Sequence, residues 1–302
     1  MIDRAVAGRV QPDTTDLGPG DDAAVVRAAD GRVVVSSDML VQGRHFRFDW
    51  STPEQVGRKA AAQNAADIAS MGAWPTAFLV SLGCPPDTPI RVADALSEGI
   101  WAEASALGAG VVGGDTVQSD QVVLSLTVLG DLRGRDAVLR AGARPGDQVA
   151  VTGRLGWSAA GLALLVADNR DFPELVDAHR VPTPPYRRGP DAAEAGATAM
   201  TDNSDGLVAD LGHLCAASGV RVDLDPAALT PDPPLRAAAQ TLGVDPSAWV
   251  LTGGEDHSLL ATFPRGAALP DGWRRIGVVR AGAGVTVGGR AWSGSGGWQS
   301  FG

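Results

Sequence analysis

Lysine is nearly absent from this chain of 302 residues, because Lys59 is the only one and arginine supplies the other basic side chains. P-loop NTPases and protein kinases each need a phosphate-binding lysine in a fixed context. No Gly-x-x-x-x-Gly-Lys-Ser/Thr motif occurs, and Lys59 lies in an Ala-rich stretch that follows no Gly-rich loop. Both classes are therefore excluded, and metal ions would have to neutralise any nucleoside triphosphate that the chain binds.

The chain also has few cysteines, a negative net charge and only short apolar runs. Cys84 and Cys215 are far apart and form no C-x-x-C pair, which favours a reduced, cytoplasmic setting. A net charge of −10 and a pI of about 4.8 argue against nucleic acid or an anionic membrane as the main partner. The first residues lack the apolar stretch of a signal peptide, and runs such as 122–130 are too short to span a bilayer.

The length and a hydrophobic fraction of 44% predict two domains with ordinary cores. In the first half, a buried strand is expected at 33–40, and a helix at 53–71, capped by Ser51 or Thr52 and ended by Gly72. The other elements expected here are a strand at 76–84, a helix opened by Thr88-Pro89 and ended by Gly108, and strands at 110–113 and 122–130. This order predicts an α/β or α+β domain whose sheet is covered mostly on one face.

A polar stretch with Gly and Pro, residues 140–147, indicates the domain boundary, which gives domains 1–138 and 139–302. A second α/β unit is expected after it. Its predicted elements are a strand at 148–152, helices at 157–166 and 205–217, the latter capped by Ser204, a Pro-rich loop at 181–190, and strands near 220–224, 258–263, 275–279 and 284–287.

Acidic clusters recur where apolar runs stop or helices begin. They are Gly20-Asp21-Asp22, Ser36-Ser37-Asp38, Asn64 to Asp67, Gly113-Gly114-Asp115 at a strand-to-loop switch, Asp202 to Gly206, and Gly253 to Asp256. Each alone is also explained by an Asp-rich turn, a strand-end or helix cap, a helix edge or a hairpin. Together they predict one site, and because carboxylates repel one another, it needs hard divalent cations with phosphate as the usual third party. The pattern therefore indicates magnesium-dependent phosphoryl transfer.

Three further features have two interpretations each. The segment from Asp202 superficially suggests a calcium loop, but Leu207 stands at its sixth position and His213 at its twelfth, which excludes that loop. His45 is either a surface histidine or a phosphate contact. Trp298, in a Gly/Ser-rich tail, is either a tail anchor or a ring that covers a bound heterocycle.

The motifs, taken in order, resemble the thiamine-monophosphate kinase family of the aminoimidazole-ribotide-synthetase-like superfamily. The resemblance covers essentially the whole length. The matching segments are GDDAAVV (20–26), SSDMLVQGRHF (36–46), AAQNAADIASMGAWP (61–75), GGDT (113–116), RAGARPGD (140–147), TDNSDGLVADLGH (201–213), GGEDH (253–257) and Trp298. The chain departs from the family pattern at Ser37, which replaces a threonine, and at His257-Ser258, which replace Tyr-Glu.

The resemblance implies ATP-dependent phosphorylation of thiamine monophosphate to thiamine diphosphate by direct transfer, without a catalytic side chain that becomes covalently modified. It implies several Mg²⁺ ions in a cleft between the two domains, and a homodimer whose N-terminal sheets pair into a shared barrel. The implied metal ligands are Asp21, Ser36, Ser37, Asp38, Asp67, Asp115, Asp202 and Asp205. The implied ATP contacts are Gly114, Asp115, Arg140 and Ser204, and the implied substrate contacts are His45, Glu255 and Trp298.

Two alternatives remain open at this point. The first is another ATP-using enzyme of the superfamily, such as selenophosphate synthetase or a hydrogenase-maturation enzyme. The former would need a reactive cysteine or selenocysteine in a Gly-rich N-terminal segment and the latter a C-terminal cysteine, and the chain has neither. The second alternative is a non-catalytic nucleotide-binding relative, which the retained carboxylates disfavour.

Overall fold

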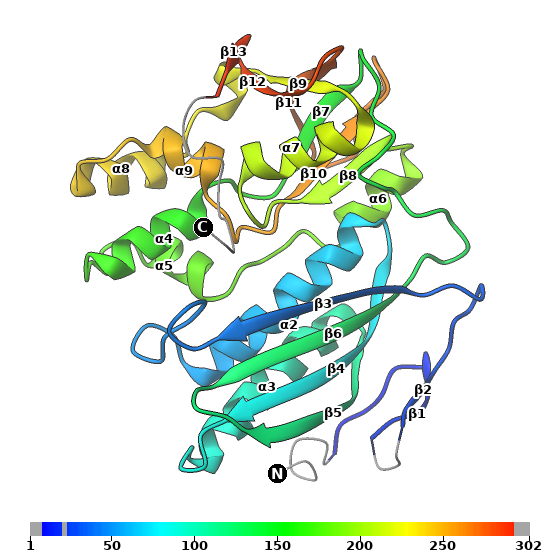
Figure 1. The fold of residues 1–302 in the computed structure, drawn as a ribbon, viewed down its shortest axis with the longest axis vertical. Coiled ribbons are helices and arrows are strands. Elements are labelled where there is room, and N and C mark those ends of the chain that lie inside the picture. Colours follow the sequence, from blue (N-terminus) through cyan, green and yellow to red (C-terminus); the bar gives the residue numbers. More distant parts are fainter. Residues whose placement is uncertain (1–7, 20–22, 293–302) are drawn as a thin grey trace. The chain divides into compact units, whose positions relative to one another are not determined.

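The computed structural model describes residues 8–19 and 23–292. The chain divides into two compact units: residues 1–68 with 73–136, called unit 1 here, and residues 69–72 with 137–302, called unit 2. Unit 1 is mixed α/β and unit 2 has helices around a larger, mostly antiparallel sheet, so the expected fold class is confirmed (Figure 1). In the described part of the chain, no helix is long and apolar enough to cross a membrane.

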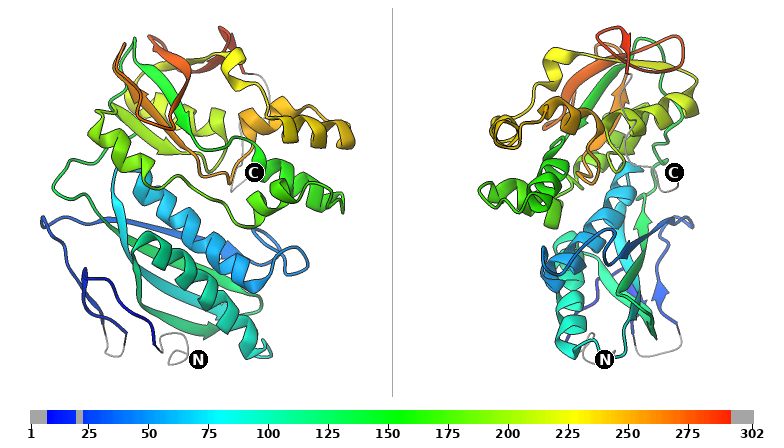
Figure 2. Two further views of the ribbon diagram at one scale, coloured as in Figure 1. Left: turned by 180° about the vertical axis from the view of Figure 1, so that it is seen from behind. Right: turned by 60° about the vertical axis from the view of Figure 1, so that its left-hand side comes forward.

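Unit 1 contains a four-stranded sheet in the order β3-β6-β4-β5. The β4–β5 pair is parallel and the other two pairs are antiparallel. Helices α2 and α3 cover one face of this sheet, and no helix among the described residues of unit 1 lies over the other face (Figures 1 and 2). The bounds in unit 1 are β1 Thr15–Leu17, β2 Val25–Val26, β3 Val34–Val41, α2 Pro53–Ser70, β4 Trp74–Cys84, α3 Ile90–Leu107, β5 Gly110–Gln118 and β6 Val123–Asp131.

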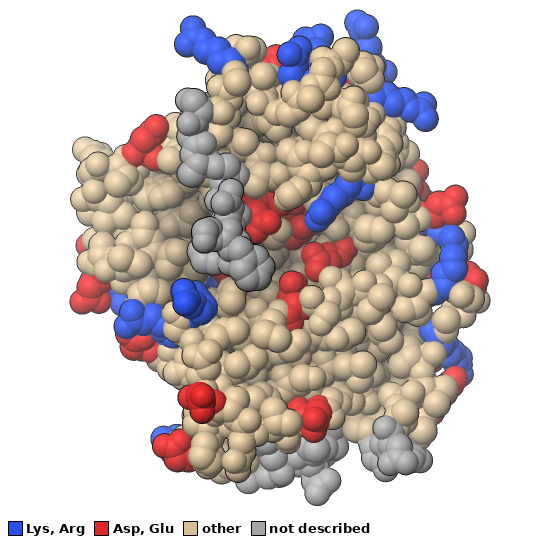
Figure 3. Space-filling model, in the orientation of Figure 1, with Lys and Arg blue, Asp and Glu red and all other residues tan. Residues whose placement is uncertain are grey.

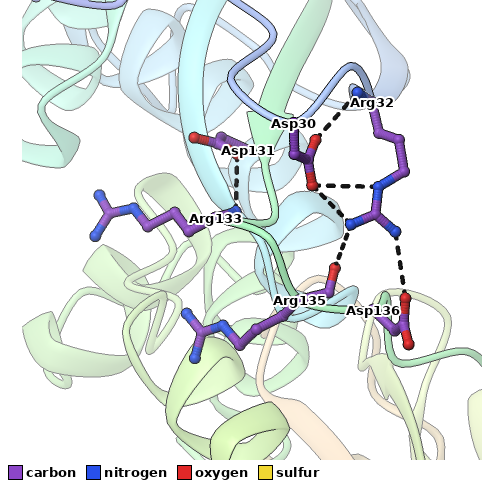
Figure 4. A network of polar contacts seen from close by, with 6 residues as sticks. All are labelled: Asp30, Arg32, Asp131, Arg133, Arg135 and Asp136. Atoms are coloured by element: carbon purple, nitrogen blue, oxygen red, sulfur yellow. Dashed lines mark hydrogen bonds and ion pairs between the residues drawn. The ribbon is translucent and has the colours of Figure 1, made fainter.

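Strand β3 was expected to be buried, but it is the edge strand of the sheet, and its side chains alternate between a half-buried and an exposed face. A network of polar contacts holds its N-terminal end (Figure 4). Arg32 donates to the Asp30 carboxylate at 2.6 Å and to the Arg135 carbonyl at 2.9 Å. These bonds tie the chain that enters β3 to the chain that leaves β6.

Helix α2 begins with a capping box, because the Gln55 N–H donates to the Thr52 hydroxyl while the Gln55 side chain accepts from the Thr52 N–H. Of the two expected caps, Thr52 is therefore the one used. Glycines then allow α2 and α3 to touch. A Cβ at Gly57 would lie 2.1 Å from the Leu96 carbonyl oxygen, and one at Gly99 would lie 1.9 Å from that of Glu54. The two helix backbones meet at these positions.

Unit 2 has a seven-stranded sheet in the order β13-β12-β9-β11-β7-β10-β8, in which only the β12–β9 pair is parallel. Its buried core includes Ala150, Met200, Leu259, Phe263 and Trp273. The bounds are β7 Gln148–Thr152, α4 Trp157–Val166, α5 Pro173–Arg180, α6 Arg188–Glu194, β8 Ala199–Asp202, α7 Leu207–Ser218, β9 Arg221–Leu224, η1 Pro226–Leu229, α8 Pro233–Leu242, α9 Pro246–Thr252, β10 Leu259–Phe263, β11 Arg274–Arg280, β12 Gly284–Val287 and β13 Arg290–Ala291.

Several of these elements were not expected. Sequence reasoning missed α5, β8, α8 and α9, and the Pro-rich segment at 181–190 was taken as loop although α6 begins at Arg188. The missed helices open with proline, as in Pro173 and Pro246, which fits the first turn of a helix as well as a loop. Proline alone therefore does not separate the two.

Candidate functional site: two sets of carboxylates

In unit 1, β3 and α2 bring two of the candidate metal ligands into contact. The Ser36 hydroxyl donates to the Asp67 carboxylate at 2.6 Å, and the strand alternation places Asp38 on the same face as Ser36. The Asp38 N–H donates to the Asn64 side chain at 3.0 Å, and Asn64 is itself tied to the Ala60 carbonyl. Asn64, which is 1% exposed, thus fixes β3 on α2, one turn from Asp67.

Ser37 lies on the opposite, outer face of the strand. Its hydroxyl donates to the Leu126 carbonyl at 3.0 Å and accepts from Thr127 at 3.1 Å. The structure therefore does not bring the Ser37 side chain together with Ser36 and Asp67. Asp21, another expected ligand, lies outside the described residues.

Asp115 was expected at a strand-to-loop switch, and that expectation is wrong. Strand β5 continues through the two glycines to Gln118, with an irregularity in its pairing with β4 just before Gly113. A Cβ at Gly114 would lie 1.9 Å from the Val80 carbonyl oxygen, so the close approach of the two strands requires glycine there. Asp115 is exposed, and its carboxylate accepts from the Thr116 N–H.

His45 follows β3 in a loop that α2 helps to fix. Its Nδ1 accepts from the Val41 N–H at 3.0 Å, so the neutral ring carries its hydrogen on Nε2. The buried Lys59 donates to the His45 carbonyl at 3.4 Å. The single lysine of the chain therefore supports the backbone of a loop that carries a predicted substrate contact.

In unit 2, three carboxylates crowd the junction between β8 and α7. Asp202 and Asp210 are buried, and Asp205, which lies between them in the sequence, is half-buried. Burial and the nearby Asp202 carboxylate raise the pKa of Asp205. Burial, with the charges of Asp202 and Asp205, raises the pKa of Asp210 to about 8. A bound cation would relieve this repulsion.

Ser204 was expected to cap α7, and this is wrong. The N-cap is Gly206, and the Asp210 carboxylate accepts from the N–H groups of Asp205 and Gly206, both at 3.0 Å. The Asp210 side chain accepts from two N–H groups at the start of the helix at once, and so satisfies donors that have no partner within the helix. Asp210 had gone unnoticed in the sequence, although an acidic residue one turn into a helix is a recognised signal.

Arg140, a predicted ATP contact, is an exposed residue whose main chain and side chain are both held. Its Nε donates to the Thr201 hydroxyl at 3.2 Å, next to Asp202, and its carbonyl accepts from Ser218. The structure thus brings Arg140 to the end of β8, beside the aspartates.

The Gly-Gly-Glu-Asp loop approaches the same junction. Glu255 has a left-handed backbone, with φ of 62°, and its N–H donates to the Ser204 carbonyl at 2.8 Å. Two residues on, His257 Nδ1 lies 3.1 Å from Asp202 Oδ2. Asp202 therefore contacts His257, and His257 stands at a position where the family pattern has tyrosine. Trp298 lies outside the described residues.

The donor set in each unit is made of carboxylate and hydroxyl oxygens, which is the chemistry that Mg²⁺ prefers. Among residues 8–19 and 23–292, no three acidic, histidine or cysteine side chains are grouped as a ready-made metal cage. Mg²⁺ in nucleotide enzymes is often held by one or two carboxylates, with waters and substrate phosphates completing the coordination. On the face drawn in Figure 3, acidic side chains are exposed on both units, whereas many basic ones of unit 2 gather over β9, β11 and β12.

Comparisons with known proteins give a consistent result. The family model of the AIR synthase related protein N-terminal domain matches residues 20–132, and that of the C-terminal domain matches residues 144–269. The thiamine-monophosphate kinase of Mycobacterium tuberculosis is 59% identical over 304 residues, which cover 100% of this chain and 91% of that protein.

Solved structures agree in fold. The Aquifex aeolicus enzyme ThiL, complexed with AMPPCP and TMP, has a TM-score of 0.83 and 32% identity, covering 99% of this chain and 94% of that one. The Escherichia coli hydrogenase maturation protein HypE has a TM-score of 0.71 at 22% identity, covering 89% and 88% of the two chains. At that level of identity, the likeness to HypE concerns the fold alone.

Proposed function

The chain belongs to the thiamine-monophosphate kinase family of AIR synthase related proteins, and we propose that it transfers the γ-phosphoryl group of ATP to the phosphate of thiamine monophosphate. The products are thiamine diphosphate and ADP. The observation that carries the proposal is the 59% identity to a thiamine-monophosphate kinase along the whole chain, together with the carboxylates retained in both units. The hydrogenase-maturation alternative has only a likeness of fold to support it.

The acceptor phosphate is already a competent nucleophile, so no side chain has to act as a strong base. The obstacle is the repulsion between two polyanions, and bound Mg²⁺ supplies the positive charge that holds such groups together and absorbs charge in the transition state. The residues that would hold it are Asp38 and Asp67 in unit 1, and Asp202 and Asp205 in unit 2, with Ser36 orienting Asp67. Asp21 completes the proposed ligand set. Ser37 and Asp115 were also predicted as ligands, but strand alternation places their side chains on the other face of the sheet from Asp38.

Both sets of residues act on one reaction in this proposal. Arg140, Gly114, Asp115 and Ser204 contact ATP, and His45, Glu255 and Trp298 contact thiamine monophosphate. The hydrogen bond from Val41 to Nδ1 supports this role for His45, because the neutral ring then offers an N–H at Nε2 to a phosphate oxygen. A tryptophan face favours the cationic thiazolium by roughly 0.5–2 kcal/mol.

The proposed assembly is a homodimer that forms through the uncovered face of the unit 1 sheet. Register and alternation place Val35, Met39, Leu79 and Val117 on that face, and all four are exposed, between 39% and 60%. A row of exposed apolar side chains on a sheet is typical of a contact with a second copy. Met39→Glu should give a monomer in sedimentation, whereas the wild type should sediment as a dimer; a monomeric wild type would refute this part of the proposal.

We also infer a cytoplasmic location, which the two free cysteines support.

One incubation tests the activity. The protein is mixed with ATP, Mg²⁺ and thiamine monophosphate, and thiamine diphosphate and ADP are quantified by chromatography. Equal amounts of the two products are expected. Turnover of a different phosphate acceptor, with no thiamine diphosphate formed by the folded protein, would refute the assignment of substrate.

A further inference from the structure

The inward face of α5 carries a histidine that the proposed reaction leaves unexplained. Leu175, Val176 and His179 are the buried residues of this helix, and His179 is only 6% exposed. A buried imidazole is costly unless its polar nitrogens find partners. His179 therefore needs polar partners in its buried position.

Helix α5 lies against α4 because of one glycine. A Cβ at Gly161 would lie 2.1 Å from the Leu175 carbonyl oxygen and 2.9 Å from the His179 Cβ. The two helices can approach this closely only where α4 lacks a side chain. This contact sets the position of the His179 ring relative to the first turn of α4.

The ring contacts two polar side chains through the same nitrogen. His179 Nδ1 lies 3.1 Å from the Ser158 hydroxyl in α4 and 3.4 Å from Glu255 Oε2. An ionised carboxylate only accepts hydrogen bonds, so Nδ1 must carry the hydrogen to bind Glu255, and the serine oxygen can accept from the same N–H. Both the neutral Nδ1–H tautomer and the charged ring satisfy this requirement.

The backbone on both sides of the Glu255 side chain is fixed independently of His179. The Glu255 N–H is bound to Ser204, and the next residue, Asp256, accepts from the N–H groups of Gly156 and Ser158 at the start of α4. The Glu255 side chain itself is 32% exposed and contacts His179. His179 is placed to fix it from the buried side, while the exposed side remains accessible to a substrate.

We propose that His179 is a positioning residue, whose Nδ1–H orients the Glu255 carboxylate toward the cationic or amino-bearing part of thiamine monophosphate. This inference rests on the proposed function and adds to it a residue that orients a substrate contact from beneath. A side chain held in one rotamer binds its ligand without losing that freedom on binding.

The test uses two amide variants that differ by one methylene group. In His179→Asn the amide N–H takes the place of Nδ1–H, whereas in His179→Gln it takes the place of Nε2–H. Because a contact with a charged group is lost, His179→Gln should raise the KM for thiamine monophosphate about tenfold, and His179→Asn should stay within about threefold of the wild type. The KM for ATP should remain unchanged in both variants.

A purely structural histidine would give another pattern. Equal KM values for thiamine monophosphate in the Asn and Gln variants, whether raised or unchanged, would overturn the inference. In a Glu255→Gln background the two variants should no longer differ, because the carboxylate they orient is gone, and a persisting difference would also overturn it. A wild type that forms no thiamine diphosphate would instead refute the proposed function on which the inference rests.

Discussion

The Ser36 hydroxyl donates a hydrogen bond of 2.6 Å to the Asp67 carboxylate and thereby joins the edge strand β3 to helix α2. Asp67 is the half-buried acid of a helix whose neighbouring alanines are fully buried. A carboxylate in such a position needs a partner. The Ser36 hydroxyl supplies one such partner.

Ser36→Ala should therefore lower the rate of thiamine diphosphate formation about tenfold, because a group that orients a metal ligand is lost, and Asp67→Asn should lower it about 100-fold. Ser37→Ala is the matched comparison, since its hydroxyl lies on the other face of β3 and binds Leu126. The loss in Ser37→Ala should be smaller than in Ser36→Ala. The reverse order would show that the hydroxyl of Ser37 is the one that serves the metal.

Asp115→Asn should reduce kcat sharply, on the order of 100-fold, while circular dichroism and the melting temperature stay close to wild type. The carboxylate is exposed and accepts from the N–H of its neighbour Thr116, a contact on which the fold of the described residues does not depend. Near-normal turnover in this variant would remove Asp115 from the site.

The buried Asp256 gives a prediction for stability against pH. Burial raises its pKa to about 7, even though the N–H groups at the start of α4 act in the opposite direction. A raised pKa means that the folded protein binds the proton more tightly than the unfolded chain. The stabilisation from this group is therefore complete below about pH 4 and is lost as the pH rises to about 7.

The comparison with Asp256→Asn isolates that contribution. The free energy of unfolding of the wild type minus that of the variant should fall between pH 4 and pH 7, as measured by urea denaturation, because only the wild type carries the titrating group. A difference that stays constant over this range would contradict the assignment.

The contact between α2 and α3 predicts a cost for one added methyl group. Gly99→Ala should destabilise the protein by about 3 kcal/mol, because the new Cβ would meet the Glu54 carbonyl. Gly212→Ala is the control, since that glycine also lies in a helix but nothing is within 4 Å of the added atom. The control should be neutral or stabilise by up to about 1 kcal/mol. Equal effects of the two changes would mean that α2 and α3 do not meet at Gly99.

The sequence was informative wherever a local pattern determines the structure. Helix α2, which ends at Ser70 just before Gly72, the strand that carries Ser36 to Asp38, and the inward Leu207, Leu211 and Leu214 of α7 could all be predicted from periodicity and capping residues. The relation between Ser36 and Asp67, 31 residues apart, depends on how a strand packs on a helix, and no local pattern contains it.

The incorrect or missed predictions also depend on contacts between residues that are not neighbours in the sequence. Gly113-Gly114 has the composition of a turn, but its glycines serve a close approach between two strands. Ser204 has the composition of a cap, but the side chain of Asp210 takes its place. His179 could not be found in advance, because its partners come from α4 and from the Gly-Gly-Glu-Asp loop, which are distant in sequence.

The dependence of product formation on Mg²⁺ tests the central claim, that oxygen ligands in both units hold the cations for a single reaction. Thiamine diphosphate formation is measured over a range of free Mg²⁺ for the wild type, for Asp67→Asn in unit 1 and for Asp205→Asn in unit 2. The wild type should be inactive after chelation and recover when Mg²⁺ is added back, and both variants should need more Mg²⁺ or turn over at least about tenfold more slowly at saturation. Activity that survives chelation, or a wild-type Mg²⁺ response in either variant, would contradict the account.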